Sequence, residues 1–285
     1  MRWTVDSETG VLTDVLLCAP DHYRWIDTNA IAHSTLSRRV RFDADIARSQ
    51  YAGMVEVLQG AGVRCHYLAP DPDQPYQVYT RDSSQTTPWG PVLTQLRMPA
   101  RRGEYAAVLD FHLRDQGFWR YATAGTCEGG DIHVIRPGLA VIGHSGVRTD
   151  LVGARQIAGW FEAAGWEVRL QPFPEHFLHL DVLFCMATDS LAVACTEALG
   201  EDFGDWLAAR GIDWIEATYA EVMAMSCNLL SLGANRVLSP QHSVRINGEL
   251  ARRQVEVFDP PLEMFSLGGG SIHCMTMPLR REPLA

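Results

Sequence analysis

Apolar residues recur at helical spacing in several stretches of the chain, and each stretch ends in a glycine followed by a short alternating segment. In residues 42–60 the apolar side chains that share one helical face are Ile46, Met54, Val57 and Leu58. The predicted helix ends at Gly60-Ala61-Gly62, and residues 63–68 then alternate like a β-strand. The pattern therefore predicts a unit made of a helix and the strand that follows it.

The same order of elements returns along the chain. Asp150 suits a helix N-cap, and the apolar face that follows consists of Leu151, Ala154, Ile157, Ala158 and Phe161. Gly165 ends this helix, and residues 166–170 form the next predicted strand. A third copy covers residues 201–215, with Phe203, Trp206 and Leu207 on the helix. Weaker copies cover residues 105–117 and 243–257.

Polar motif residues repeat at a matching interval. Asp82, Glu128, His179, Asn228 (in a predicted strand, 227–230) and Cys274 follow one another at separations of 46, 51, 49 and 46 residues. A period near 50 with one helix–strand order predicts five related α/β units in a single domain, residues 1–285. We expect the units to form a ring with the motif residues converging on its axis. An ordinary open α/β sheet would fit the same alternation.

Composition and charge narrow the classes of function. The chain has 285 residues, 47% of them hydrophobic, which is sufficient for a large packed core. Its formal net charge of −10 argues against nucleic acid as a partner and is compatible with a small cationic substrate. No apolar run approaches the length of a membrane span, and the first residues lack a signal-peptide pattern, so we expect no membrane association.

The seven cysteines indicate reduced thiols in a cytoplasmic protein, because their number is odd and no CxxC pair occurs. No Cys/His cluster has the spacing of zinc ligands, so no metal is expected. Cys185 and Cys195 lie in apolar runs typical of a core, and Cys127 is interpreted as a bystander.

One cysteine differs from the rest. Cys274 follows the glycine run Gly268-Gly269-Gly270, and glycine permits backbone angles and close approaches that other residues cannot make. A loop that ends in a buried thiol is the alternative interpretation. Upstream, the motifs Thr80-Arg81-Asp82, Glu128-Gly129-Gly130-Asp131 and His179-Leu180-Asp181 add a candidate base and several carboxylates. Taken singly, these motifs also suit a surface ion pair, a turn and a strand cap.

In their order, from about residue 79 to residue 281, these motifs resemble the guanidine-modifying (pentein) superfamily, which includes arginine deiminases, dimethylarginine dimethylaminohydrolases, agmatine deiminases and amidinotransferases. The resemblance implies a five-bladed α/β propeller that acts on a small guanidine substrate without a cofactor. A homodimer is compatible with it, although the sequence does not determine the oligomeric state.

The resemblance also implies roles for individual residues. Cys274 matches the nucleophile that forms a covalent thiouronium-type intermediate, and His179 matches the general acid/base. Glu128 completes the catalytic set, and Asp82 and Asp181 join it as carboxylates that bind the guanidinium. Arg148 matches an arginine that binds the substrate α-carboxylate, and Arg101 matches a second such position. His133, His144, His176 and His273 are interpreted as structural or neighbouring groups.

Two departures bear on the substrate. Arginine deiminases carry Arg where this chain has Gly269 and Asn where it has Tyr76, which weakens the case for plain arginine bound as in those enzymes. Amidinotransferases usually carry Asp where this chain has Glu128, which favours a hydrolase. Amidino transfer to an amine is the runner-up function, and a non-catalytic binding protein on the same fold is the third.

Overall fold

The computed structural model describes residues 3–284, and within that range fifteen strands form five three-stranded sheets. Four sheets take their strands in chain order: β3 Ser84–Thr87, β4 Gly90–Leu93 and β5 Arg120–Tyr121; β6 Ile132–Arg136, β7 Leu139–His144 and β8 Glu167–Pro172; β9 Phe184–Thr188, β10 Leu191–Ala194 and β11 Asp213–Glu216; β12 Leu230–Gly233, β13 Arg236–Leu238 and β14 Glu256–Phe258. The fifth joins distant segments, β15 Met277–Arg281, β1 Leu12–Cys18 and β2 Arg64–Leu68.

Every sheet has the same internal pattern. Its middle strand pairs antiparallel with one neighbour and parallel with the other, as β7 does with β6 and β8. A parallel partner needs a crossover, and a helix occupies each one. These helices are α2 Ala44–Gly60, α3 Tyr105–Leu113, α4 Leu151–Glu162, α6 Glu201–Ala208 and α8 Val244–Arg252. The predicted repeat of five α/β units is thereby confirmed, and the single open sheet is not what forms.

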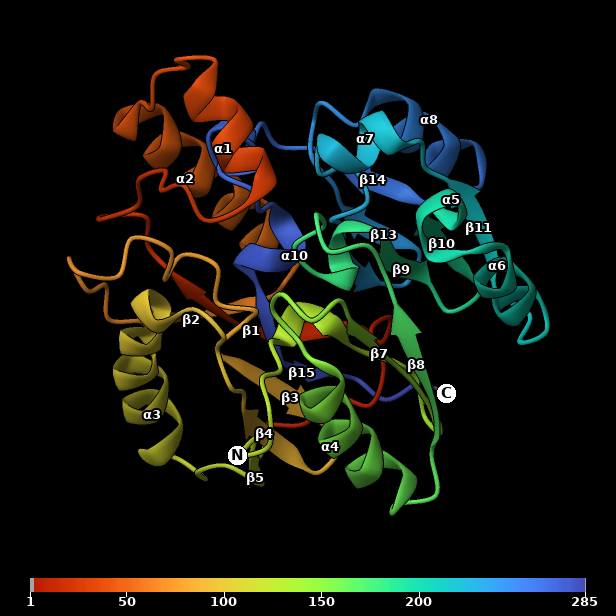
Figure 1. The fold of residues 1–285 in the computed structure, drawn as a ribbon. Coiled ribbons are helices and arrows are strands. Elements are labelled where there is room, and N and C mark those ends of the chain that lie inside the picture. The colour runs from red at the N-terminus through yellow and green to blue at the C-terminus, as the bar shows by residue number, and fades with distance from the viewer. Residues whose placement is uncertain (1–2, 285) are drawn as a thin grey trace.

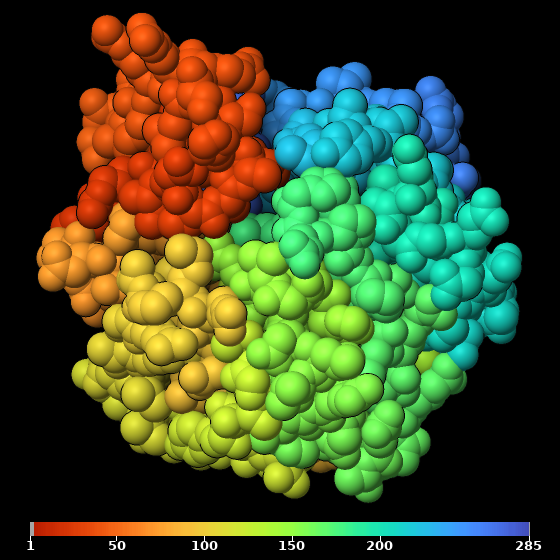
Figure 2. Space-filling view, in the orientation of Figure 1, coloured from red at the N-terminus to blue at the C-terminus, as the bar shows by residue number. Residues whose placement is uncertain are grey.

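The five units follow one another around the molecule. In Figure 1 the crossover helices lie at the outside and α10 (Ile272–Met275) lies near the middle. Figure 2 shows the chain colours succeeding one another around the same face. The fifth sheet brings β15 beside β1, with Thr13 bonded to the carbonyl of Arg280, 267 positions away.

The crossover helices bind to their sheets through apolar stripes, and on α4 most of the predicted stripe is buried, although Leu151, expected on it, is 38% exposed. On α4 the buried side chains include Ala154, Ile157, Ala158 and Phe161, which share a core with Ile132 and Ile142 of the adjoining strands. Burying each large side chain of this kind stabilises the fold by about 1.5–3 kcal/mol. The helices therefore hold the sheets in place, and the inner ends of the sheets are available to build a site.

Two predictions about these elements are wrong in detail. Ile46 was expected on the buried face of α2, but it is 45% exposed, and Ala47, Tyr51, Met54 and Leu58 form the buried stripe instead. Ile46 lies in the first turn of α2, which begins at Ala44 and is capped by Asp43, and the side chains that face the core start at Ala47. Asn228 was expected within a strand, but β12 begins at Leu230, so Asn228 lies in the segment before it.

The remaining helices are short. They are α1 Ala30–Ser37, α5 Thr196–Leu199, α7 Tyr219–Met223 and α9 Glu263–Ser266, with the 3-10 turns η1 Pro99–Glu104, η2 Gly129–Asp131 and η3 Leu180–Val182. Within residues 3–284 no helix has both the length and the apolar character needed to cross a bilayer.

Candidate active site

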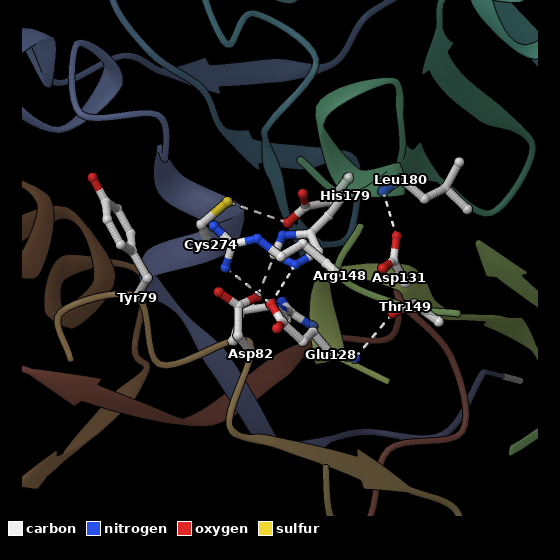
Figure 3. A network of polar contacts seen from close by, with 12 residues as sticks. Tyr79, Asp82, Glu128, Asp131, Arg148, Thr149, His179, Leu180 and Cys274 are labelled. Atoms are coloured by element: carbon white, nitrogen blue, oxygen red, sulfur yellow. Dashed lines mark hydrogen bonds and ion pairs between the residues drawn. The ribbon is translucent and has the colours of Figure 1, made fainter. Parts of the chain in front are cut away.

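The motif residues occupy equivalent places in the five units, just before the first strand of each sheet. Asp82 precedes β3, Glu128 precedes β6, His179 precedes β9, Asn228 precedes β12 and Cys274 precedes β15. Because the five sheets surround a common centre, residues at this one position meet there, and Figure 3 shows Asp82, Glu128, His179 and Cys274 together. The prediction that the motif residues converge is confirmed.

Cys274 is held by neighbours on two sides. It is 2% exposed, its N–H donates to Asn228 Oδ1 at 3.2 Å, and Asn228 Nδ2 donates to its sulfur at 3.2 Å. The thiol in turn donates to Asp181 Oδ2 at 3.3 Å. Burial, followed by the negative charges of Asp181 and Asp82, raises the pKa of Cys274 well above its ordinary value. With only these protein groups around it the sulfur is protonated, and a cation beside it would favour the thiolate.

His179 and Glu128 form a buried ion pair. Burial opposes both charges, but the His179 Nε2–Glu128 Oε2 hydrogen bond of 2.8 Å and the charges of nearby groups together outweigh it. Burial would lower the pKa of His179, yet the charge of Asp82 and the bond to Glu128 raise it to about 10. Burial would raise the pKa of Glu128, yet His179 and Arg148 lower it to about 2. His179 is therefore an acid at neutral pH.

The bonds already made decide which atoms remain free. Glu128 Oε1 accepts from Arg97 N–H at 2.9 Å and Oε2 accepts from His179, so both oxygens of Glu128 are engaged. The geometry thus favours Glu128 as the group that orients His179. His179 Nδ1 makes no hydrogen bond within the described residues and lies 3.6 Å from Asp82 Oδ1, so Nδ1 is the nitrogen that faces the rest of the site.

The glycines before β6 make this geometry possible. A Cβ on Gly130 would lie 2.8 Å from the His179 ring, and one on Gly129 would lie 2.0 Å from the carbonyl oxygen of Arg81. The last motif residue, Asp131, accepts from Leu180 N–H at 2.7 Å and so fixes the segment that carries His179. The glycine pair therefore lets the segment before β6 approach the segments that carry Arg81 and His179 closely.

Four buried polar atoms around the sulfur lack a hydrogen-bond partner among residues 3–284. Two are carboxylate oxygens, one is a guanidinium nitrogen and one is an imidazole nitrogen: Asp82 Oδ1, Asp181 Oδ1, Arg148 Nη1 and His179 Nδ1. A buried polar atom without a partner costs about 1–3 kcal/mol. The set can therefore be satisfied by a molecule that offers donors at one end and an acceptor at the other.

The two predicted carboxylate-binding arginines differ. Arg101 is buried and already paired, with Asp82 Oδ2 at 2.6 Å and with Glu104 Oε1 at 2.7 Å. Arg148 Nη2 donates to the carbonyl of Thr28 at 3.1 Å, and Nη1, which lies 3.6 Å from Glu128 Oε2, makes no hydrogen bond among the described residues. Arg148 is thus the better placed of the two to meet a substrate carboxylate.

A small pocket reaches Cys274, and it is lined by Asn29, Tyr76, Tyr79, Asp82, Arg101, Arg148, Leu178, Gly268, Gly269 and Cys274. Residues 19–43, here called the cover segment, contribute Asn29 to its lining. Asn29 Nδ2 donates to the carbonyl of Gly268 at 3.1 Å. Gly269 has φ +94°, and a Cβ there would lie 2.4 Å from Asn29. The position where arginine deiminases carry Arg is therefore filled by Asn29.

A metal ion does not suit the centre of this site. Asp82, Glu128 and His179 could bring three ligand atoms together. However, the raised pKa of His179 places a proton between the two carboxylates, and Arg148 lies beside Glu128. The charges are balanced by a proton and an arginine, which fits the expectation of a site that works without a metal.

All seven predicted site residues meet in this one place. What sequence reasoning missed is mostly local support: Asn228 was used only as a marker of the period, and Asn29 and Tyr79 carry no motif. His273, interpreted as a neighbouring group, contacts Asp181 directly at 2.8 Å. The regular spacing of Asn228 with the other four motif residues was the available signal for its role.

This fold and cysteine–histidine–carboxylate site define a class of guanidine-modifying proteins, and comparison with known proteins agrees. Residues 26–281 match the family described as eukaryotic N,N dimethylarginine dimethylhydrolases. The chain belongs to this family.

Individual relatives extend the comparison. The chain is 31% identical over 283 residues to the uncharacterized protein YkgA of Bacillus subtilis strain 168, covering 96% of this chain and 94% of that one. It is 25% identical over 249 residues to the arginine deiminase of Rhodococcus opacus strain B4, covering 74% of this chain and 61% of that enzyme.

Solved structures share the fold. A variant of DDAH from Pseudomonas aeruginosa, complexed with citrulline, superimposes with a TM-score of 0.78 at 20% identity, covering 94% of this chain and 99% of that one. The N-terminal domain of ArgZ, an arginine dihydrolase of cyanobacteria, gives a TM-score of 0.81 at 21% identity, covering 95% and 98%.

Proposed function

We propose that this protein is a cysteine-dependent hydrolase that acts on the guanidino group of arginine or an arginine derivative through a covalent thiouronium intermediate. One observation carries the proposal: the carboxylate oxygens Asp82 Oδ1 and Asp181 Oδ1 and the guanidinium nitrogen Arg148 Nη1 make no hydrogen bond among the described residues. Asp82 and Arg148 line one pocket with Cys274, and Asp181 contacts the Cys274 thiol. A guanidinium donates to the first pair and a carboxylate accepts from the third, so an amino-acid guanidine matches the unpartnered atoms.

The first half-reaction follows from the charges. The guanidinium cation beside Cys274 offsets the carboxylate charges that raise the pKa of the thiol, so the thiol releases its proton to solvent as the substrate binds. The thiolate attacks the guanidinium carbon. His179, charged at neutral pH, gives its Nδ1 proton to the departing amine nitrogen as the C–N bond breaks, leaving an amidino group on sulfur.

In the second half-reaction the neutral His179 takes a proton from water. The hydroxide equivalent attacks the thiouronium carbon, the C–S bond breaks, and a ureido product leaves Cys274 as it was. Glu128 keeps the imidazole in one orientation throughout, since both of its oxygens are bonded to His179 and Arg97. If an amine replaces water, the same intermediate gives amidino transfer.

The decisive experiment incubates the protein with a panel of guanidines and follows both protein and products by mass spectrometry. The panel contains arginine, Nω-methylated arginines and agmatine, with water alone or glycine as acceptor. We expect a ureido product and a transient adduct on Cys274, absent in Cys274→Ser. Transfer to glycine with negligible hydrolysis would show that the protein is an amidinotransferase. No turnover of any guanidine would refute both hydrolysis and amidino transfer.

We further propose that the five sheets act as the blades of a propeller around this pocket. The shared internal pattern of the sheets supports the arrangement. The expectation of a cytoplasmic location gains support from the seven cysteines, all unbridged in the structure. A homodimer stays a prediction that light scattering tests.

A further inference from the structure

The residue next to the nucleophile contacts a carboxylate of the site from outside the substrate pocket. The ring of His273 is 3% exposed, and its Nδ1 lies 2.8 Å from Asp181 Oδ2. His273 lines a second small cavity together with Glu8, Arg81 and Arg281, and that cavity shares no lining residue with the pocket that reaches Cys274. Asp181 therefore lies between His273 and the substrate pocket.

The bond to Asp181 determines which ring nitrogen of His273 carries the hydrogen. A carboxylate accepts, so His273 Nδ1 carries the hydrogen and donates it. Burial, and then the charge of Arg81, lowers the pKa of His273 to about 4, against the opposing effect of Asp181. The ring is therefore neutral near pH 7, and Nε2 has a lone pair that faces Glu8 Oε1 at 4.0 Å.

Charged groups approach this ring from four segments. Asp181 comes from η3, Glu8 from the segment before β1, Arg81 from the segment before β3, and His133 from β6 with its ring centroid 5.5 Å away. Arg81 Nε donates to the backbone carbonyl of His273 at 3.2 Å. These contacts leave the ring one orientation, in which Nδ1 points at Asp181.

The residues around His273 include possible metal ligands, but their charges are better balanced by a proton on His133 than by a metal ion. Glu8, His133 and His273 could bring three ligand atoms together. Burial would lower the pKa of His133, yet Glu8 at 3.1 Å raises it, so these two residues form an ion pair. Arg81 and Arg281 add two more positive charges in the same cavity, which opposes a dication.

We propose that His273 is a positioning residue that holds Asp181 Oδ2 through Nδ1–H and so directs Asp181 Oδ1 at the guanidinium of the substrate. The inference rests on the proposed function. Asp181 Oδ2 is shared by His273 and the Cys274 thiol, while Oδ1 has no partner among the described residues. Without His273 the carboxylate keeps only the thiol, and it can turn about its own axis or take up a proton.

Two substitutions of similar size separate the two sides of the ring. In His273→Asn the amide nitrogen takes the place of Nδ1 and can still donate to Asp181. In His273→Gln the amide nitrogen takes the place of Nε2 and faces Glu8 instead. We expect kcat of the Asn variant to stay within about fivefold of wild type. We expect the Gln variant to lose on the order of 10²-fold, the scale of a misplaced reacting group.

The pH profile excludes a merely structural role. The bond from His273 is the largest effect that lowers the pKa of Asp181, to about 2 against burial. The acidic limb of kcat/KM should therefore move to higher pH in His273→Gln and stay in place in His273→Asn, with both variants melting near the wild-type temperature. Equal effects of the two substitutions on kcat and on this limb would overturn the proposal.

A readout without turnover keeps this test apart from that of the proposed function. Asp181 accepts from the Cys274 thiol and raises its pKa, so a change in how Asp181 is held should change the rate of Cys274 alkylation at a given pH in His273→Gln and leave it near the wild-type rate in His273→Asn. The difference should vanish in an Asp181→Asn background. If neither variant folds, ¹⁵N NMR of wild type should find the His273 hydrogen on Nδ1; a hydrogen on Nε2 alone would refute the proposal. Inactivity of wild type on every guanidine would refute the proposed function and leave these readouts intact.

Discussion

The groups proposed to do the chemistry and the groups that cover them come from two kinds of segment. Cys274, His179, Glu128 and Asp82 occupy one repeated position, just before the first strand of a sheet. Their geometry is fixed by buried contacts such as the 2.8 Å bond between His179 and Glu128. The cover segment, residues 19–43, lies outside this repeat and supplies no ionised group to the pocket.

Apart from the bond from Arg148 to the carbonyl of Thr28, the cover segment is held by neutral donors and carbonyls. Trp25 Nε1 donates to the carbonyl of Met264 at 2.7 Å, and Tyr76 Oη donates to the carbonyl of Ile26 at 2.9 Å. Single bonds of this type contribute about 0.5–1.5 kcal/mol each. The difference teaches that the reaction depends on the repeat, while access to the site depends on a segment held by a few weaker bonds. The predictions below test this division.

The largest effect is expected for Cys274→Ser. A serine hydroxyl is a far weaker nucleophile at neutral pH, so turnover should be abolished while the melting temperature changes little. Cys65→Ser, on the half-buried thiol of β2, is the matched control and should retain activity. Near wild-type turnover by Cys274→Ser would show that Cys274, and with it the repeated position, does not supply the nucleophile.

For His179→Ala we expect a loss of about 10²–10⁴-fold in kcat, as for general acid–base groups. His176→Ala, at an exposed histidine three positions earlier, should change kcat little. The measurement is steady-state turnover together with the lifetime of the covalent adduct, which should lengthen in His179→Ala. An unchanged pH–rate profile would exclude the acid/base role.

Arg148→Ala should weaken binding of amino-acid guanidines by about 1.5–3 kcal/mol, seen as a raised KM, since it removes a charge-assisted bond. Agmatine lacks the α-carboxylate, so its KM should hardly change. Arg155→Ala, at an exposed arginine of α4, controls for the altered net charge. Wild-type preference for agmatine over every amino-acid guanidine would contradict the assigned contact.

The buried pair also predicts how stability depends on pH. The folded-state pKa of His179 is raised to about 10, so its contribution is complete below about 6.5 and is lost as pH rises through 10. That of Glu128 is lowered to about 2, so its contribution is complete above about 4.5 and is lost as pH falls through 2. Urea unfolding of wild type and Glu128→Gln should therefore differ most between pH 4.5 and 6.5. If the difference in the free energy of unfolding between the two proteins did not change with pH, His179 and Glu128 would not form an ion pair.

The smallest effect is expected in the cover segment. Asn29→Ala removes the bond to Gly268 and the cap of α1, where Asn29 Oδ1 accepts from Ala32 N–H at 2.9 Å. We expect faster hydrogen exchange in residues 19–43 and a change in KM below about fivefold, with kcat preserved. Asn29→Asp keeps the cap and loses only the donor, so its exchange should be intermediate. A large loss of kcat in either variant would contradict the claim that the cover segment has no part in the chemical step.

Much of the site was predictable because the motif residues recur at a regular interval in the sequence. The period of about 50 placed Asp82, Glu128, His179 and Cys274 at equivalent positions, and the helix–strand alternation gave the five units. The motifs could not give the state of each atom, because that depends on neighbours. Arg101 is bound by Asp82 and Glu104, and both oxygens of Glu128 are occupied, which only the packed structure shows.

The N-terminal contributions escaped prediction for a different reason. Asn29 and Glu8 stand in segments without a motif, and they reach the site through contacts with Gly268 and His133, more than a hundred positions away. The exposed Ile46 shows the same limit on a smaller scale, because which of two neighbouring helical faces is buried depends on what packs against the helix.

The pairing of β1 with β15 has a consequence for the timing of synthesis. The nucleophile stands three residues before β15, and β15 completes the sheet of β1 across 267 positions. At about 5–20 residues per second, β1 waits roughly 13–53 seconds for this partner. A nascent chain can meanwhile assemble the acid, the carboxylates and four sheets without the sulfur. On the proposed function, the chain cannot turn over substrate until translation has passed residue 281, and the Cys274 thiol joins carboxylates and an imidazole that come earlier in the chain.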